Sequence, residues 1–334
     1  MQSLNESKAI YIAKGFAIFS VVCAHAAVEP ENCAEVIRVI VRLMSYMGTY
    51  GVPMFFLFAG FFYARESRSL GKFWKHKAST IIVPWIFCES IVWLYVVLRK
   101  GGVTFENWIK FILGVNHSTY YLIVLLLFYI LFWYLRRRAW VLWGCILLSL
   151  AALVAVGQSI PFVLHVNEWT ITPYLNPLNW MMYFCAGILL FTQNKIQYLF
   201  QLAKRILPFS CVVLFGLIVY HLKANISWSY FSQFALINII FQMLVVMGIC
   251  ARLSSRNPKQ LIKIGEESFT IYLLHELGAG AIVRLSLCGG VVLIVLRPII
   301  NILLVKLGIW CIRFLLKERK KLRDTAYLLI GIRD

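Results

Sequence analysis

The chain has 334 residues, of which 61% are hydrophobic and only 14% carry a charge, and its mean hydropathy is +0.79. A soluble domain of this length needs a more charged surface, so the composition excludes a soluble protein and is typical of a membrane protein with several spans. The net charge of +19 does not indicate a nucleic-acid partner, because the basic residues lie in short segments between apolar runs. The nine cysteines include no CxxC pair, and we expect neither a metal ion nor a disulfide framework.

Ten apolar runs follow one another along the chain, each close to the roughly 20 residues that cross a bilayer as a helix. No linker rich in proline, glycine or serine divides them. We therefore predict an all-α polytopic membrane protein: one domain over residues 1–334 that bundles about ten transmembrane helices and ends in a short basic cytoplasmic tail from about residue 315. The runs lie near residues 9–28, 44–64, 78–98, 119–135, 139–157, 177–193, 206–222, 233–252, 268–285 and 291–314.

The charges between the runs predict which side of the membrane each connecting segment occupies. One alternate set of segments contains 22 Lys or Arg residues and the other set contains 4. Because basic loops stay on the cytoplasmic side, we expect both termini in the cytoplasm. The basic set comprises 65–77, 136–138, 195–205, 252–263 and the tail from Arg313; the other set comprises 29–35, 99–118, 158–176, 221–232 and 286–290.

The first run contains the segment KGFAIFSVVCAH, in which Lys14 and His25 enclose ten mostly apolar residues. On an α-helix, eleven positions return to within roughly 20° of the start and rise by about 16 Å. The two side chains would therefore share one helix face without touching. With both termini in the cytoplasm, Lys14 lies toward the cytoplasmic end of the span and His25 toward the outer end.

Ionisable side chains inside the apolar runs are candidate functional residues, because burying a charge in a membrane is costly. Structural alternatives stay open for each of them: a histidine hydrogen-bonded between helices, a lysine that reaches the interface, and carboxylates that pair with a cation elsewhere in the bundle. We interpret His275 and Arg284 as structural. The full set comprises Lys14, His25, Glu89, His275, Glu276 and Arg284.

Four sequence blocks follow one another along the chain: KGFAIFSVVCAH (14–25), VPMFFLFAGFFY (52–63), FWKHKASTIIVPW (73–85) and IGEESFTIYLLH (264–275). In content and order they resemble the signatures of acyltransferase family 3, the integral-membrane O-acyltransferases. With ten expected spans, the resemblance covers nearly the whole chain. A lysine followed directly by glycine in the first block is similar to the branch that includes fucose O-acetylase-like proteins.

Two positions depart from the pattern of this family. Its third block commonly has a second basic residue about four positions before the proline, where this chain has Thr80; Lys77, seven positions before Pro84, is retained. Ala59 stands where many members have serine. Both departures concern the contacts to CoA phosphates and the acceptor more than the fold.

The resemblance implies an activity and a location. Members transfer an acyl group, in most cases acetyl, from cytoplasmic acyl-CoA to a hydroxyl of a cell-surface or lipid-linked glycan. We therefore expect a multi-pass protein of the cell membrane, in a bacterium the plasma membrane, that binds acetyl-CoA as acyl donor and is surrounded by lipid.

The resemblance also suggests roles for the ionisable residues. Lys14, Lys75 and Lys77 would hold the CoA phosphates through charge-assisted hydrogen bonds. His25 would act as general base on the acceptor hydroxyl or would itself accept the acyl group. Either of the two carboxylates, Glu89 or Glu276, could orient the imidazole, and their spacing does not decide between them.

Two other classes of function stay open. One is a transporter that moves a small solute or glycan through the same ten-helix groove. The other is a non-catalytic partner in envelope assembly, with a homo-oligomer as a further form of association. Because a carrier has no particular need of a histidine at position 25, the sequence favours the enzyme.

Overall fold

The computed structural model describes residues 2–28, 34–101, 103–115, 119–155, 165–166, 169–170, 172–224, 230, 234–287 and 290–332. The first half of the chain is helical in these residues. Its elements are α1 (Gln2–Ala26), α2 (Glu35–Met47), α3 (Gly51–Ala64), α4 (Leu70–Lys77), the π-helical turn η1 (Ala78–Ile82), α5 (Val83–Lys100), α6 (Phe105–Ile112), α7 (Tyr120–Leu131) and α8 (Ala139–Ala155).

The second half begins with two very short strands that pair antiparallel, His165 with Thr170 and Val166 with Trp169. Helices then continue to the end of the described chain. The elements are β1 (His165–Val166), β2 (Trp169–Thr170), the 3₁₀ turn η2 (Pro173–Leu175), α9 (Leu178–Thr192), α10 (Ile196–Arg205), α11 (Leu207–Ala224), α12 (Ala235–Leu253), the 3₁₀ turn η3 (Ser254–Arg256), α13 (Lys259–Glu266), α14 (Ser268–Leu287), α15 (Gly290–Leu315) and α16 (Lys320–Ile330).

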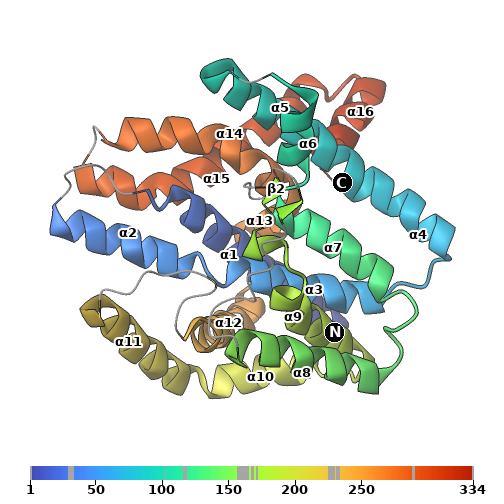
Figure 1. Cartoon of the computed structure of the whole chain (residues 1–334), viewed down its shortest axis with the longest axis vertical. Coiled ribbons are helices and arrows are strands. Elements are labelled where there is room, and N and C mark those ends of the chain that lie inside the picture. The colour runs from blue at the N-terminus through green and yellow to red at the C-terminus, as the bar shows by residue number, and fades with distance from the viewer. Residues whose placement is uncertain are drawn as a thin grey trace.

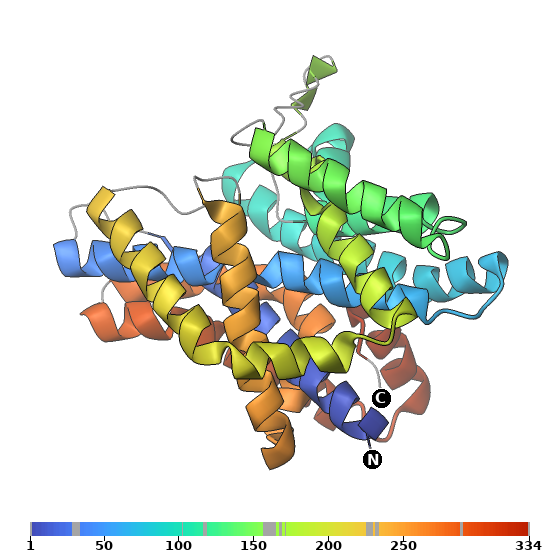
Figure 2. The ribbon, with the colours of Figure 1, turned by 90° about the horizontal axis from the view of Figure 1, so that it is seen from below.

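The first helix lies at the centre of the bundle. It packs against α2, α3, α12, α13, α14 and α15, and Ile12, Ala13, Ala17 and Ile18 on it have no exposed surface. A helix that is apolar all round is expected to be enclosed by other helices in this way. Figure 1 shows α14, α15 and α2 running alongside one another next to α1, and Figure 2 shows α12 crossing the bundle at a steep angle to them.

The helices support a multi-pass membrane protein. Each of the ten predicted runs contains a helix, and α7 and α8 are apolar but shorter than a span. Both termini lie in the right half of Figures 1 and 2. The number ten and the cytoplasmic position of the termini stay predictions. Six helical segments of the described chain are long and apolar enough to cross a bilayer: Ser7–Ala26, Glu35–Ala64, Leu70–Leu98, Leu207–Ala224, Ala235–Arg256 and Val291–Leu315.

Two glycines bring α3 and α9 into close contact. A Cβ atom on Gly60 would overlap the carbonyl of Phe184, and a Cβ atom on Gly187 would overlap the carbonyl of Leu57. Small residues allow membrane helices to approach until their backbones touch. This crossing fixes the aromatic face of α3, part of which lines the cavity described below.

The segment from α4 to α5 is one continuous helix that contains a π-helical turn. Pro84 has no N–H group and its ring crowds the carbonyl four residues earlier, so a regular α-helix cannot pass through it unchanged. The π turn at Ala78–Ile82 lies directly before it and absorbs the mismatch. Thr80 lies in this turn and donates a hydrogen bond to the His76 carbonyl oxygen at 2.7 Å.

The basic segment after residue 315 folds back onto the bundle as a helix. α16 packs against α5, and Tyr327, Ile330 and Ile332 are buried. The Thr270 hydroxyl of α14 donates a hydrogen bond to the carbonyl of Gly331 at 3.0 Å. α15 ends at Leu315, where we expected the tail to begin, and the helix that follows was not predicted.

Candidate active site

Lys14 and His25 lie at two different cavities, which α1 connects. The cavity at Lys14, called the lysine cavity below, has a volume of about 320 Å³ and is also lined by Lys77, Glu66 and Glu266. The cavity at His25, the histidine cavity, has a volume of about 700 Å³ and is also lined by Glu276. Because α1 is helical throughout, the predicted rise of about 16 Å separates the two positions along it.

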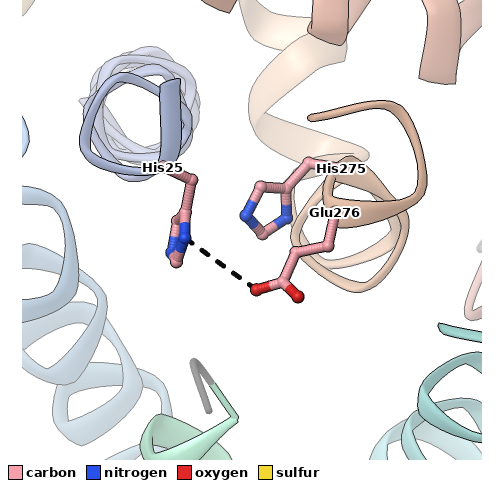
Figure 3. Close-up of side chains that lie close together, drawn as sticks. All are labelled: His25, His275 and Glu276. Carbon is pink, nitrogen blue, oxygen red and sulfur yellow. Dashed lines mark ion pairs between the residues drawn. The ribbon is translucent and has the colours of Figure 1, made fainter. Parts of the chain in front are cut away.

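His25 faces two ionisable side chains of α14. Its Nδ1 atom lies 3.9 Å from Oε1 of Glu276, and its ring centroid lies 4.9 Å from that of His275 in an edge-to-face arrangement. Figure 3 shows His275 and Glu276 projecting from α14 toward His25 on α1. His25 and Glu276 retain partial exposure, 34% and 18% of their side chains, so a substrate in the histidine cavity can reach both.

His275 is buried and its tautomer follows from one contact. Its Nδ1 atom lies 2.6 Å from the carbonyl oxygen of Tyr272. Because a carbonyl can only accept a hydrogen bond, Nδ1 carries the proton and the neutral ring has its lone pair on Nε2. The Asn301 amide of α15 donates to the His275 carbonyl at 2.9 Å. We interpreted His275 as structural from the sequence, and the structure places it beside His25.

The three side chains could also hold a metal ion. One ligand atom each from His25, His275 and Glu276 lies within 4.8 Å of the other two. In a tetrahedral zinc site the ligand atoms are about 3.3 Å apart, given metal–ligand distances near 2.0–2.1 Å. The three groups would therefore have to move closer together to bind zinc, whereas their present spacing suits transfer of a proton to or from a substrate between them.

Arg297 on α15 holds the end of α1 that carries His25. Its side chain is fully buried, and its Nη1 atom donates hydrogen bonds to the carbonyls of Val28 at 2.8 Å and Ala26 at 3.3 Å. The last carbonyls of a helix lack partners within the helix and attract a cation. The guanidinium therefore fixes the turn that positions the imidazole. The sequence analysis missed Arg297, although the criterion of a charge within an apolar run applies to it.

The lysine cavity combines a charged opening with aromatic walls. Lys77 Nζ lies 4.8 Å from the ring centroid of Tyr129, and Lys14 Nζ lies 5.4 Å from that of Tyr11, both within cation–π range. α13 can approach α1 here because Gly15 has no side chain: a Cβ atom on it would come within 2.9 Å of Leu261. The remaining walls include Phe55, Phe58, Phe62, Tyr121 and Phe269.

Glu66 brings a negative charge to the same opening. Burial alone would raise its pKa, but the amide and guanidinium of Arg68 and the charge of Lys77 hold the pKa below the ordinary value of 4.5. The Arg68 guanidinium lies 2.8 Å from Oε2 of Glu66. Glu66 is therefore ionised at neutral pH and offsets part of the positive charge at the cavity.

Four of the residues that line the histidine cavity are tyrosines. Tyr120 and Tyr174 have ring centroids 5.1 Å apart, and Tyr230 donates a hydrogen bond to the Gly48 carbonyl at 3.2 Å. Phenol rings with polar edges suit a ligand that has both apolar and hydroxyl surfaces. The tyrosines come from distant segments of the chain, so no local pattern in the sequence could indicate them.

The remaining predicted site residues lie away from the two cavities or outside the described part. Lys75 is exposed and does not line the lysine cavity. Glu89 on α5 is 3% exposed and interacts electrostatically with Glu276 and Tyr272, but among the described contacts it is Glu276 that faces His25. The side chain of Arg284 lies outside the described residues.

The fold and the site define a class of protein: a multi-pass membrane protein in which a histidine and a carboxylate meet inside the bundle. Residues 8–316 match the family model described as an acyltransferase domain. The chain therefore belongs to acyltransferase family 3 and is a membrane acyltransferase. Comparison with curated proteins and with solved structures gave no match. α16 lies beyond the matched residues.

Proposed function

We propose that the protein transfers an acyl group, namely acetyl, from cytoplasmic acetyl-CoA to a hydroxyl of a glycan on the other side of the membrane. The observation that supports this most is the pair of cavities along one α1 face. One is lined by two lysines near the middle of the helix, and the other is lined by a histidine paired with a carboxylate near its C-terminal end.

The lysine cavity is the donor site in this proposal. Lys14 and Lys77 bind the CoA phosphates as charge-assisted donors. The pantetheine arm, about 15–20 Å long, is comparable to the rise of about 16 Å between Lys14 and His25. A thioester can thus reach the histidine cavity while the phosphates stay at the cytoplasmic opening. This orientation follows the loop charges, which put the Lys14 end in the cytoplasm.

The histidine cavity is the acceptor site. His25 removes the proton of the acceptor hydroxyl as the oxygen attacks the thioester carbonyl, or it accepts the acyl group first and passes it on. Glu276 orients the imidazole and stabilises the imidazolium that forms. The C–S bond breaks, and the CoA thiolate takes up a proton. Tyrosine rings around the cavity suit the faces of a sugar ring, and their hydroxyls suit its polar edge.

Calorimetry with acetyl-CoA tests the donor site. The purified protein should bind acetyl-CoA, and Lys14→Ala and Lys77→Ala should each weaken the binding. Lys75→Ala is the matched control, because Lys75 is exposed and lies outside the cavity, and it should bind as the wild type does. His25→Ala should retain most of the binding. Salt should weaken it, since partly exposed phosphate contacts are screened.

Two results would contradict the proposal. If acetyl-CoA does not bind but a free sugar or amino acid stabilises the protein, the transporter is the better interpretation. If acetyl-CoA binds and only His25→Ala abolishes it, the division between a phosphate site and a chemical site along α1 is wrong.

A further inference from the structure

Tyr272 lines both the lysine cavity and the histidine cavity, which no other described lining residue does. Its side chain is buried, with 6% of its surface exposed. The ring of Tyr121, which lines the lysine cavity, packs against it edge to face with centroids 5.7 Å apart. The ring of His275 lies 6.0 Å from that of Tyr272. Tyr272 therefore stands at the boundary of the two cavities.

The position of Tyr272 on α14 leads to the same conclusion. Ser268, Tyr272 and Glu276 are four residues apart, so they lie along one face of the helix. Ser268 lines the lysine cavity and Glu276 lines the histidine cavity. The helix rises about 12 Å between them, with Tyr272 halfway. A path from one cavity to the other along this face of α14 passes the ring of Tyr272.

We propose that Tyr272 is the partition between the donor and acceptor sites, and that its ring keeps water of the histidine cavity away from the thioester. The names donor and acceptor rest on the proposed function, whereas the partition rests on the geometry of the cavities alone. The physical need is clear. When water attacks a thioester, its oxygen bonds to the carbonyl carbon, the C–S bond breaks and the thiol leaves with a proton, so the acyl group is lost as acetate. Exclusion of water from the reacting group prevents this loss.

Side-specific thiol labelling tests the partition without any acyl chemistry. Ala279 lines the histidine cavity and Ala59 lines the lysine cavity, and both are partly exposed. Each is replaced by cysteine in a background without the native cysteines. A charged, membrane-impermeant methanethiosulfonate is then added from the Lys14 side of sealed vesicles. With Tyr272 present, Ala59→Cys should react and Ala279→Cys should not. With Tyr272→Ala, the rate at Ala279→Cys should rise at least tenfold.

Three controls make the result specific to the ring. Tyr272→Phe keeps the ring and removes the hydroxyl, so Ala279→Cys should remain protected. The rate at Ala59→Cys should be unchanged in every variant that folds. If Tyr272→Ala changes the labelling rate of Ala59→Cys, the smaller truncation Tyr272→Leu is used in its place. It should give a labelling rate at Ala279→Cys between those of the wild type and a full truncation. The proposal is overturned if Ala279→Cys is labelled from the Lys14 side with Tyr272 intact, or if truncation that preserves the Ala59→Cys rate causes no increase.

Acetyl-CoA hydrolysis in the absence of acceptor supplies the second readout. Tyr272→Ala should release acetate and free CoA several times faster than the wild type, and Tyr272→Phe should not. The two measurements separate the hypotheses. If Tyr272→Ala alters the labelling but acetyl-CoA does not bind, the partition is supported and the proposed function is refuted. If acetyl-CoA binds but the labelling is unaltered, the partition is refuted and the proposed function is kept.

Discussion

The cavity beside the middle of α1 is lined by two lysines and by aromatic residues, while the cavity near the C-terminal end of α1 is lined by tyrosines and by a histidine paired with a carboxylate. The first arrangement has the chemistry to attract an anion and has apolar walls beside it. The second can hydrogen-bond to a hydroxyl and move its proton. In the proposed function, donor binding and chemistry are therefore separated along one helix, and substitutions should affect them separately.

The largest expected effect is at the histidine end. His25→Ala should reduce acetyl transfer about 10²–10⁴-fold, because a positioned acid–base group is lost. Glu276→Gln, which keeps the shape and removes the charge, should cause a smaller loss. Neither should change the affinity for acetyl-CoA. Steady-state transfer assays with protein that inserts and accumulates normally check this. A His25→Ala variant that keeps more than half of the wild-type rate would make His25 a structural residue.

A second substitution tests whether Arg297 of α15 holds the C-terminal end of α1 in place. Arg297→Leu removes the donor to the carbonyls of Ala26 and Val28. Hydrogen bonds to charged groups are worth about 1.5–3 kcal/mol, so kcat should fall about 10- to 100-fold if the imidazole loses its position. The KM for acetyl-CoA should not change, since Lys14 lies about 16 Å away along α1. Arg297→Lys keeps a cation and should retain more activity; equal losses in both variants would argue against a positioning role.

At the lysine cavity, removal of an acidic side chain should strengthen the binding of acetyl-CoA, whereas removal of a lysine should weaken it. Glu66 is ionised at neutral pH and lies at the opening where phosphates would bind. Glu66→Gln should therefore lower the KM for acetyl-CoA, by up to about fivefold if a partly exposed charge contributes up to about 1 kcal/mol. Glu106→Gln is the control, because Glu106 is exposed and lies outside both cavities. A raised KM in Glu66→Gln would show that this carboxylate helps to bind the donor.

The smallest effect concerns stability at the lysine end and not activity. Glu267 lies 2.9 Å from Lys306 Nζ and 2.6 Å from Arg313 Nη1 of α15. Burial alone would raise its pKa, but hydrogen bonds from these two cations hold the pKa below the ordinary value of 4.5. The stabilisation is therefore present above about pH 4.5 and is lost as the pH falls through the lower, folded-state pKa.

Thermal unfolding of the wild type and of Glu267→Gln between pH 3 and 7 measures this effect. The wild type should have the higher melting temperature at neutral pH, and the difference should shrink below about pH 4.5. A difference that stays constant over the whole range would mean that the ionised carboxylate contributes nothing.

The sequence predicts the two ends of the site better than what lies between them. Lys14 and His25 are on one helix, so their shared face follows from helical periodicity alone. Glu276 stands out as a charge within an apolar run. Tyr272 does not stand out, because an aromatic residue is not unusual in a membrane helix. Its role depends on Tyr121 and α1, which approach it from other parts of the chain.

The fold, too, is only partly predictable from the sequence. Apolar runs locate the helices because the length of a span is set by the bilayer. They do not show that α16 packs against α5 and places Gly331 at the lysine cavity. The basic residues on one side of α16 lower its mean hydropathy, although Tyr327 and Ile330 on it are buried. Long-range packing of a short amphipathic helix leaves no mark in hydropathy.

The central claim, that an acyl group passes between the lysine cavity and the histidine cavity along α1, is tested most directly by transfer across a sealed membrane. Proteoliposomes are given ¹⁴C-acetyl-CoA on the Lys14 side and a panel of soluble aryl glycosides on the His25 side. We predict acetylated glycoside on the His25 side, and none when His25→Ala replaces the wild type. Labelled product that forms only when the glycoside is placed on the same side as acetyl-CoA would contradict the account.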